Sequence, residues 1–261
     1  MNSVNKTLYI PLYGKAYVSK KGILLQDPKA EEIWEAEGFS LKGKAASKWL
    51  AYYMGMRSAV FDAWLREQMA GNREAVIVQV GCGMDSRVER VGTRGRQWFD
   101  VDFPEVIMER KRYYKEENGY HMVGGDIRNS DWLQTIPKGF PVILVMEGVS
   151  MYLTEEERKS FLASVGDHFG AVSLLMDCYT MLGARMSKYK NPIHTIGVTQ
   201  VYGMENPRDP VTDGIDFVGE WEMTPEKLID QLSGVEKSVF QKLYGGNFSK
   251  RLYKLLEYRR E

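Results

Sequence analysis

Cysteine is scarce in this sequence, which contains only two among its 261 residues, Cys82 and Cys178. Two cysteines cannot build a disulfide framework, and their separation does not match the spacing of zinc ligands. No apolar run approaches the roughly 18 residues that a membrane-spanning helix needs. The first residues, from Met1 to Tyr9, lack the basic and then apolar pattern of a signal peptide. We therefore expect a cytoplasmic protein that binds no metal and does not associate with a membrane.

The chain also lacks a net charge, because 35 lysines and arginines balance 35 aspartates and glutamates. No overall charge attracts it to nucleic acid, so we expect no nucleic-acid partner. A hydrophobic content of 44% and a charged content of 27% are ordinary for a globular protein. The length suits one large α/β domain or two small ones. We expect a single domain over residues 1–261, with a helical cover (1–73) on a core (74–261), as a monomer or a homodimer.

The first 73 residues predict helices that follow a short extended start. Asp27 and Pro28 are typical of the N-cap and the first residue of a helix, which we expect to continue to Glu37 and to end at Gly38. A longer helix follows and ends near residues 71–72, because its apolar residues recur every three or four positions. These residues are Trp49, Tyr52, Tyr53, Met56, Val60 and Trp64.

From Ala75 onward, short apolar runs alternate with helical segments. The first run, 75–80, is interrupted only by Gln79, as expected of a strand that is covered on both faces. This alternation predicts a parallel sheet with right-handed crossovers. The expected strands are 75–80, 97–101, 121–123, 141–146 and 171–176, and the expected helices are 86–91, 104–118, 155–168 and 224–232. The segments 235–244 and 252–259 are expected to form a closing antiparallel pair.

The first of these strands leads into a glycine turn, Gly81-Cys82-Gly83. Glycine allows the backbone to turn tightly and lets a ligand approach where a Cβ would block it. At the end of the second strand stands Asp102, whose carboxylate is placed to accept hydrogen bonds from both ribose hydroxyls of an adenosine cofactor. Two glycines alone would also suit a tight connection between a strand and a helix that binds no ligand. The prediction of a nucleotide-type cofactor therefore rests on the strand before the glycines and the acid after them.

Two features distinguish between cofactors. A dinucleotide-binding site normally has a third glycine at the position where this chain has Ser86, and the neighbouring Asp85 would repel phosphates. S-adenosylmethionine carries no phosphate and has a sulfonium cation, which suits acidic residues at the edge of the sheet. Two further acids follow expected strands, namely Asp126 after the third and Glu147 after the fourth. Strand carboxyl ends are where open α/β sheets bind ligands, so the acids favour S-adenosylmethionine.

Four segments together resemble the leucine carboxyl methyltransferase family, a family of class I methyltransferases. They are residues 80–87, residues 100–107, residues 125–128 with Asp131 and Trp132, and residues 147–153. Residues 11–16 and 27–30 resemble the branch that includes tetracenomycin-type polyketide O-methyltransferases. The resemblance covers residues 8–180. It implies a Rossmann-like fold with a mostly parallel seven-stranded sheet, an antiparallel closing strand and an N-terminal helical cover.

The resemblance also implies a role for individual residues in binding S-adenosylmethionine. The glycine turn, with Gly81 and Gly83, would line the methionine part, and Asp102 would hold the ribose. The adenine would lie against Asp126, which meets its amino group, and Ile127, which lies beside the ring.

The charged ends of the methionine part would have their own partners. Glu147 would face the ammonium group, while Lys15 and Arg57 would bind the carboxylate, with Lys20 as an alternative to Lys15. A zwitterion needs one anionic and one cationic partner, which agrees with this assignment. Generic class I enzymes have an acid where this chain has Gln79.

The acceptor is less well defined. Tyr152 is the candidate for contacting the acceptor oxygen, and Tyr179 and Arg185 are candidates for recognising an acidic substrate. A carboxylate acceptor is already ionised at neutral pH, whereas a phenol would need a base such as His194. We expect an O-methyltransferase for a carboxylate or phenolic hydroxyl of a small acidic or polyketide-like molecule. The alternatives are a protein C-terminal carboxyl methyltransferase, a catalytically inactive cofactor-binding protein and a nicotinamide-dependent oxidoreductase.

Overall fold

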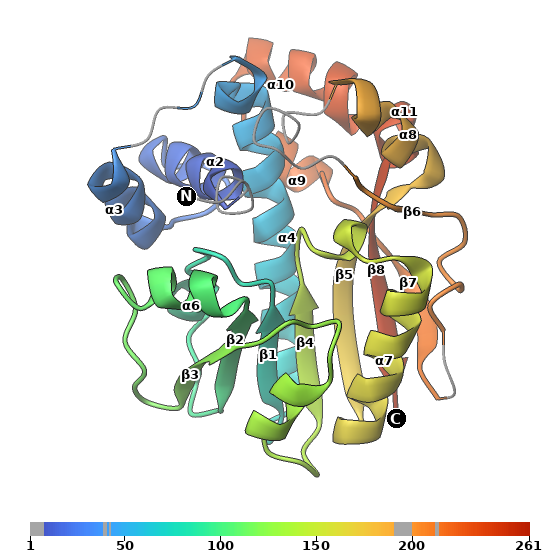
Figure 1. Cartoon of the computed structure of the whole chain (residues 1–261). Helices are drawn as coiled ribbons and strands as arrows, with labels where there is room; N and C mark the ends of the chain where they lie inside the picture. The colour runs from blue at the N-terminus through green and yellow to red at the C-terminus, as the bar shows by residue number, and fades with distance from the viewer. Residues whose placement is uncertain (1–7, 39–40, 42, 191–199, 212–213) are drawn as a thin grey trace.

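The computed structural model describes residues 8–38, 41, 43–190, 200–211 and 214–261. Their strands form one eight-stranded sheet with the main order β3-β2-β1-β4-β5-β8-β7 (Figure 1). The strands are β1 (Val76–Val80), β2 (Trp98–Asp102), β3 (Tyr120–Gly124), β4 (Val142–Met146), β5 (Val172–Thr180), β6 (Gly203–Met204), β7 (Asp216–Trp221) and β8 (Tyr253–Arg260). The seven strands of the main path match the expected number, and the short β6 adds a parallel pair beside β5.

The closing antiparallel strand is β8, which runs antiparallel to both β5 and β7. Its position matches the expected strand 252–259, but the partner assigned to it was wrong. Residues 235–244 form a helix, α10 (Gly234–Phe240), followed by a π-helical turn (Gln241–Gly245). Their apolar residues recur at a spacing of four and five, which fits a helix better than a strand. The true partner, β7, alternates between exposed and half-buried residues and contains Gly219, so its apolar pattern is weak.

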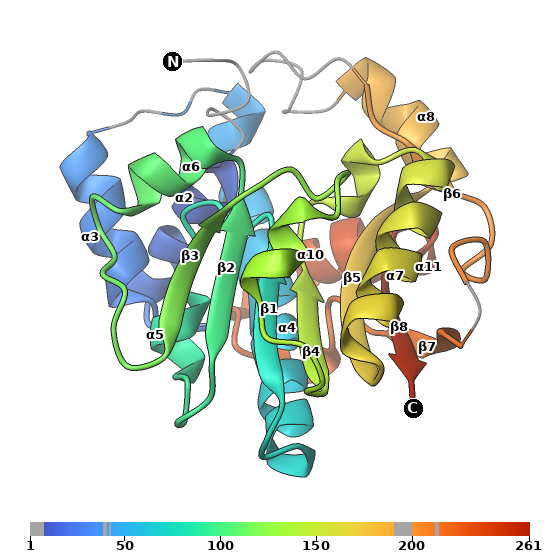
Figure 2. The ribbon, with the colours of Figure 1, turned by 60° about the horizontal axis from the view of Figure 1, so that its bottom comes forward.

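The central strands are covered on both faces, as their continuous apolar runs predict. Every residue of β1, β2 and β4 is buried. Neighbouring residues of β1 point to opposite sides, since Ile77 belongs to one hydrophobic cluster and Val76 and Val78 to the other. Helix α4 (Lys48–Gly71) covers the first face and α7 (Glu155–Phe169) covers the second, as Figure 2 shows.

Among the helices of residues 8–73, α3 (Pro28–Glu37) and the end of α4 at Gly71 lie where the sequence predicts, whereas no bounds were predicted for the first helix, α2 (Tyr9–Lys20). Helix α3 is capped by Asp27, whose side chain accepts a hydrogen bond of 2.9 Å from the Ala30 amide. It ends at Gly38, which takes the left-handed conformation. Helix α2 packs between α3 and α4. This arrangement places α2 and part of α4 near the carboxyl ends of the strands (Figure 1).

The remaining helices include one clear correction. Helix α6 (Pro104–Arg110) stops eight residues before the expected end at Asn118. The chain must turn back into β3 there, and Asn118 and Gly119 adopt the left-handed backbone that this reversal needs. The other helical segments are η1 (Gly43–Ala46), α5 (Arg87–Val91), η2 (Asp131–Thr135), η3 (Ser150–Tyr152), α8 (Met181–Lys190), α9 (Glu226–Ile229) and α11 (Asn247–Lys250). Across the described residues, no helix is both long and apolar enough to span a bilayer.

Candidate active site

The strand order brings the predicted acids to one edge of the sheet. The glycine turn follows β1, the strand at which the chain order reverses between β2 and β4. Asp102 ends β2, Asp126 follows β3 and Glu147 follows β4. All of these strands are parallel, so their carboxyl ends meet at the same edge.

The glycine turn has the backbone that its sequence predicts. Gly81 and Gly83 have φ values of 62° and 51°, which lie in the left-handed region. A Cβ at Gly81 would come within 2.1 Å of the Val149 Cγ2 atom, so only glycine fits here. The turn is also held from outside, because Arg110 donates a hydrogen bond of 2.9 Å to the Gly83 carbonyl.

Asp102 is tied directly to this turn. Its Oδ2 atom accepts a hydrogen bond of 2.8 Å from the Gly83 amide, and its Oδ1 atom accepts one of 2.8 Å from the Phe103 amide. Burial raises the pKa of Asp102 to about 6, although the two amide hydrogen bonds oppose the shift. The side chain is therefore largely ionised at neutral pH, with lone pairs left for further donors.

A second acid binds to two arginines at the end of β4. Glu147 Oε1 accepts hydrogen bonds of 2.9 Å from Arg57 Nε and from the Ser58 hydroxyl. Its other oxygen, Oε2, accepts a hydrogen bond from Arg87 Nη2. Burial alone would raise the pKa of Glu147, but the guanidinium groups of Arg57 and Arg87 outweigh it and hold the pKa at about 2. Arg57 and Glu147, which the sequence placed at opposite ends of a zwitterion, thus lie side by side.

Lys15 joins the same buried network through another carboxylate. Its Nζ atom lies 2.9 Å from Asp85 Oδ1, and Asp85 Oδ2 lies 3.2 Å from Arg87 Nη1. Arg90 binds Asp85 and is also paired with Asp62, at 2.8 and 2.7 Å. The network therefore connects α2, α4, α5 and the end of β4 through alternating charges. All of these side chains are at most 8% exposed.

The sequence prediction missed three charged members of this site. Asp85 was used only as an argument against a phosphate, and Arg87 was noticed only as part of a motif, although they hold Lys15 and Glu147 in place. The third, Asp177, accepts a hydrogen bond of 2.7 Å from the Gly148 amide and lies 3.1 Å from Arg57 Nη1. Asp177 directly follows the expected fifth strand, so the strand-end rule used for the other acids would have found it.

Asp126 and Ile127 lie apart from this network. The Asp126 carboxylate is half-buried and binds Arg128, whose guanidinium lowers the pKa of Asp126. Ile127 is half-buried and packs against the cluster that α7 covers. Neither residue is recorded in contact with Asp102 or Glu147 within the described part of the chain. Both follow β3, which pairs with β2, the strand that ends at Asp102.

The acceptor candidates are only partly brought together. Tyr152, in η3, and Tyr179, at the end of β5, are half-buried and pack against the same hydrophobic cluster, and Tyr179 packs edge-on against Tyr253 at 4.9 Å between ring centres. Burial raises the pKa of Tyr152, so its hydroxyl stays protonated and can donate a hydrogen bond. Arg185 is exposed on α8, and the described contacts do not join it to either tyrosine. His194 lies outside the described residues.

The residues present fit a zwitterionic, phosphate-free cofactor on two independent observations. Arg57 Nη2 makes no hydrogen bond to any described residue, whereas Nε and Nη1 are engaged. The buried Gln79 Oε1 atom also lacks a partner among the residues described, beside the network that contains Asp85. A carboxylate would satisfy the first group and an ammonium the second, and a methionine moiety supplies both.

This fold and this site define a class I S-adenosylmethionine-dependent methyltransferase. The solved structure of magnesium protoporphyrin IX methyltransferase from Synechocystis PCC 6803 with bound S-adenosylmethionine shares the fold. It has a TM-score of 0.52 at 11% identity, and the match covers 88% of this chain and 91% of that one.

The chain belongs to the leucine carboxyl methyltransferase family, whose sequence model matches residues 8–166. Tetracenomycin polyketide synthesis O-methyltransferase TcmP from Streptomyces glaucescens is 29% identical over 243 residues, which cover 92% of this chain and 90% of the relative. The S-adenosyl-L-methionine-dependent methyltransferase dpfgK from Gibberella zeae is 27% identical over 240 residues, which cover 80% and 78% of the two chains. These relatives confirm the predicted family and place the chain in its TcmP-like branch.

The close approach at Gly81 leads to a testable prediction. We expect Gly81→Ala to lower the melting temperature and to abolish binding of S-adenosylhomocysteine, because the new methyl group collides with Val149 and displaces the turn. Gly92→Ala is the matched control, since Gly92 also has a positive φ, of 77°, but open space around its Cβ position. Adding Val149→Ala to Gly81→Ala should restore part of the binding. Calorimetric titrations that show equal binding by Gly81→Ala and Gly92→Ala would contradict this role of the turn.

Proposed function

We propose that this protein methylates a carboxylate of a small aromatic, polyketide-like molecule, with the phenolic hydroxyl of such a molecule as the second candidate. The observation that carries the proposal is the pairing of Glu147 with Arg57, at the edge of the sheet where Asp102 also lies, together with Tyr152, Tyr179 and Tyr253 near Arg57 and Asp177. The paired charges suit the zwitterionic end of the cofactor, and the tyrosines suit an aromatic acceptor.

The residue roles that we propose follow from charge and position. Asp102 accepts hydrogen bonds from the ribose hydroxyls with the lone pairs that Gly83 and Phe103 leave open. Glu147 attracts the methionine ammonium group, and Arg57 binds the carboxylate through Nη2, with Lys15 as a second cation. Gly81 and Gly83 allow the backbone to approach the methionine part. Asp126 and Ile127 hold the adenine.

When bound, S-adenosylmethionine supplies an electrophilic methyl group on a sulfonium. The protein's own contribution is to hold the acceptor oxygen in line with that methyl group and away from water. Tyr152 is placed to donate a hydrogen bond to the acceptor, and its raised pKa makes it a poor base. Tyr179 contributes an aromatic wall, and we keep Arg185 as a candidate for an acidic group on the acceptor.

A carboxylate is the acceptor that this environment suits best. The described histidines, His121 and His168, bind Gln97 and the Ile136 carbonyl and are thus engaged away from Tyr152. The nearby acid, Asp177, is enclosed by Arg57, Tyr253 and Gly148. A carboxylate is already ionised and needs no base. The aromatic surroundings and the relationship to a polyketide O-methyltransferase both favour an aromatic body.

The position of methylation can be tested with one acceptor that carries both groups. We expect a hydroxynaphthoate, incubated with the enzyme and radiolabelled S-adenosylmethionine, to gain an alkali-labile methyl ester, because its carboxylate is ionised throughout the assay. The rate should change little between about pH 7 and about pH 9. An alkali-stable methyl ether, formed at a rate that rises with pH, would instead identify the phenol as the acceptor.

The pKa of Asp102 leads to a second prediction. An ionised carboxylate accepts from both ribose hydroxyls, and protonation removes that capacity. One unit below a pKa of about 6, only about a tenth of the side chain is ionised, so S-adenosylhomocysteine should bind roughly tenfold more weakly at about pH 5 than at about pH 8. Asp102→Asn should bind weakly with a flat profile. Asp126→Asn is the control, because it should keep the wild-type pH dependence. A wild-type slope in Asp102→Asn would assign the titration to another group.

A further inference from the structure

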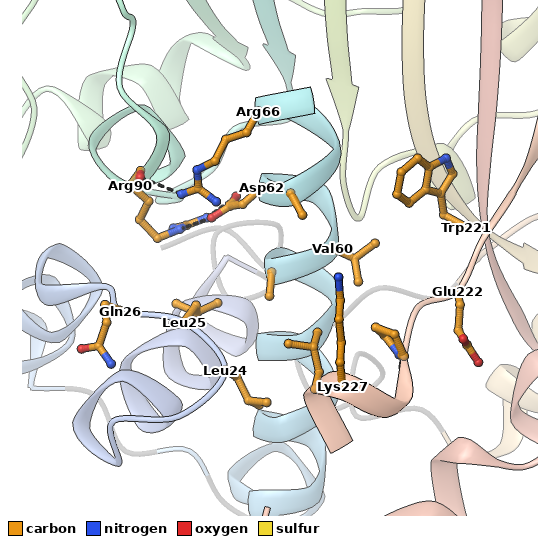
Figure 3. A pocket seen from close by; sticks show the side chains of 14 residues that line it. Leu24, Leu25, Gln26, Val60, Asp62, Arg66, Arg90, Trp221, Glu222 and Lys227 are labelled. Carbon is orange, nitrogen blue, oxygen red and sulfur yellow. Dashed lines mark hydrogen bonds and ion pairs between the residues drawn. The ribbon is translucent and has the colours of Figure 1, made fainter. Parts of the chain in front are cut away.

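A cavity of about 530 Å³ lies against the second half of α4. Its walls come from the segment between α2 and α3, from α4, from Arg90 of α5, and from the chain that runs from the end of β7 into α9 (Figure 3). Leu24 and Leu25 lie on one side of α4, and Trp221 lies on the other. This volume falls in the range of cavities that hold small organic ligands.

The inner surface is largely apolar. Leu24, Val60 and Leu228 are buried core residues that also line the cavity, and Pro225 and the half-buried Trp221 add further apolar surface. Trp221 is fixed in place, because its indole N–H donates a hydrogen bond of 2.7 Å to Glu257. The apolar part of the cavity wall is therefore held in a fixed position.

The charges that line the cavity leave an excess of positive charge. Asp62 is neutralised by Arg87 and Arg90, and Glu222 is paired with Lys250. Arg66 donates one hydrogen bond of 2.8 Å to the Arg90 carbonyl and forms no ion pair with a described residue. Lys227 likewise has no anionic partner among the described side chains, and its ammonium group reaches along α4 toward Val60 (Figure 3). Two cations thus border an apolar cavity without a matching anion.

The cavity is distinct from the site proposed for the cofactor. None of Gly81, Asp102 and Glu147 lines it. The two sites share only a wall, formed by Asp62 and Arg90, whose other contacts lead to Asp85 and Arg87 in the buried network. A molecule in the cavity would therefore leave the carboxyl edge of the sheet open.

We propose that this cavity binds an organic anion, namely a carboxylate or sulfonate attached to an apolar body. Trp221, Leu24 and Val60 enclose the body, while Arg66 and Lys227 attract the anionic group. Charge-assisted hydrogen bonds from these cations supply the selectivity for an anion over a neutral molecule of the same shape.

The probe for the test is 8-anilinonaphthalene-1-sulfonate, whose fluorescence rises in apolar surroundings. Titrations use the full chain saturated with S-adenosylhomocysteine, so that the cofactor site is blocked. We expect Arg66→Gln with Lys227→Gln to raise the dissociation constant about tenfold or more. Ala63→Leu, which fills the cavity from an exposed position on α4, should raise it similarly. Lys138→Gln is the control, since this exposed lysine lies outside the cavity.

Unchanged dissociation constants in the charge variant would overturn the proposal, even if Ala63→Leu weakened binding, because the cavity would then accept the apolar body alone. In a second titration, which starts from the protein without S-adenosylhomocysteine, displacement of the bound probe by that compound would also overturn the proposal, since the two sites would not be separate. Melting temperatures of the variants show that each is folded. The proposed function is tested separately by binding of S-adenosylhomocysteine itself, so the two ideas can fail independently.

Discussion

The site depends on one interaction, the pairing of the Glu147 carboxylate with two buried guanidinium groups, those of Arg57 and Arg87. It joins α4 and α5 to the end of β4, and Asp85 extends the same chain of charges to Lys15 on α2. Such buried pairs add little net stability, because desolvation offsets their attraction, yet removing one partner typically costs about 3–5 kcal/mol. The network therefore selects one arrangement of the helical cover on the sheet. In our account it also presents to a zwitterion one carboxylate and the Nη2 group of Arg57, which has no hydrogen-bond partner among the described residues.

The sheet supplies the other half of the site. Parallel strands bring Asp102, Glu147 and Asp177 to one edge, and the reversal of strand order at β1 opens that edge above the glycine turn. Gly81 has no room for a side chain, and Gly83 donates its amide to Asp102. The shape of the glycine turn and the position of the Asp102 carboxylate are therefore set together.

Local sequence rules predicted the parts of the fold that depend on neighbouring residues. Such rules predicted that α3 is capped by Asp27 and ends at Gly38, and that the strand containing Gln79 is buried. The rules failed at β7, where a distant partner decides the outcome, because this strand has a weak pattern and pairs with β8. The wrong assignment of residues 235–244 to a strand has another cause, since their local spacing is helical and was not followed.

The same distinction applies to the site. The acids at strand ends could be predicted, since strand direction alone brings them together. The pairing of Arg87 with Glu147 could not, because the two residues are 60 positions apart and meet only in the folded chain, where the start of α5 lies beside the end of β4. Asp177 was within reach of the strand-end rule and was missed. Its contact with Gly148 requires the register between β4 and β5.

The central claim, that Glu147 receives the methionine ammonium group, is best tested by a double comparison of affinities. Calorimetry would measure S-adenosylhomocysteine and its analogue without the amino group against the wild-type protein and Glu147→Gln. Our account predicts that loss of the amino group weakens binding to the wild type by at least about tenfold and binding to Glu147→Gln only slightly. Any general disturbance of the network by the substitution cancels in this comparison. An equal loss of affinity in both proteins would contradict the account.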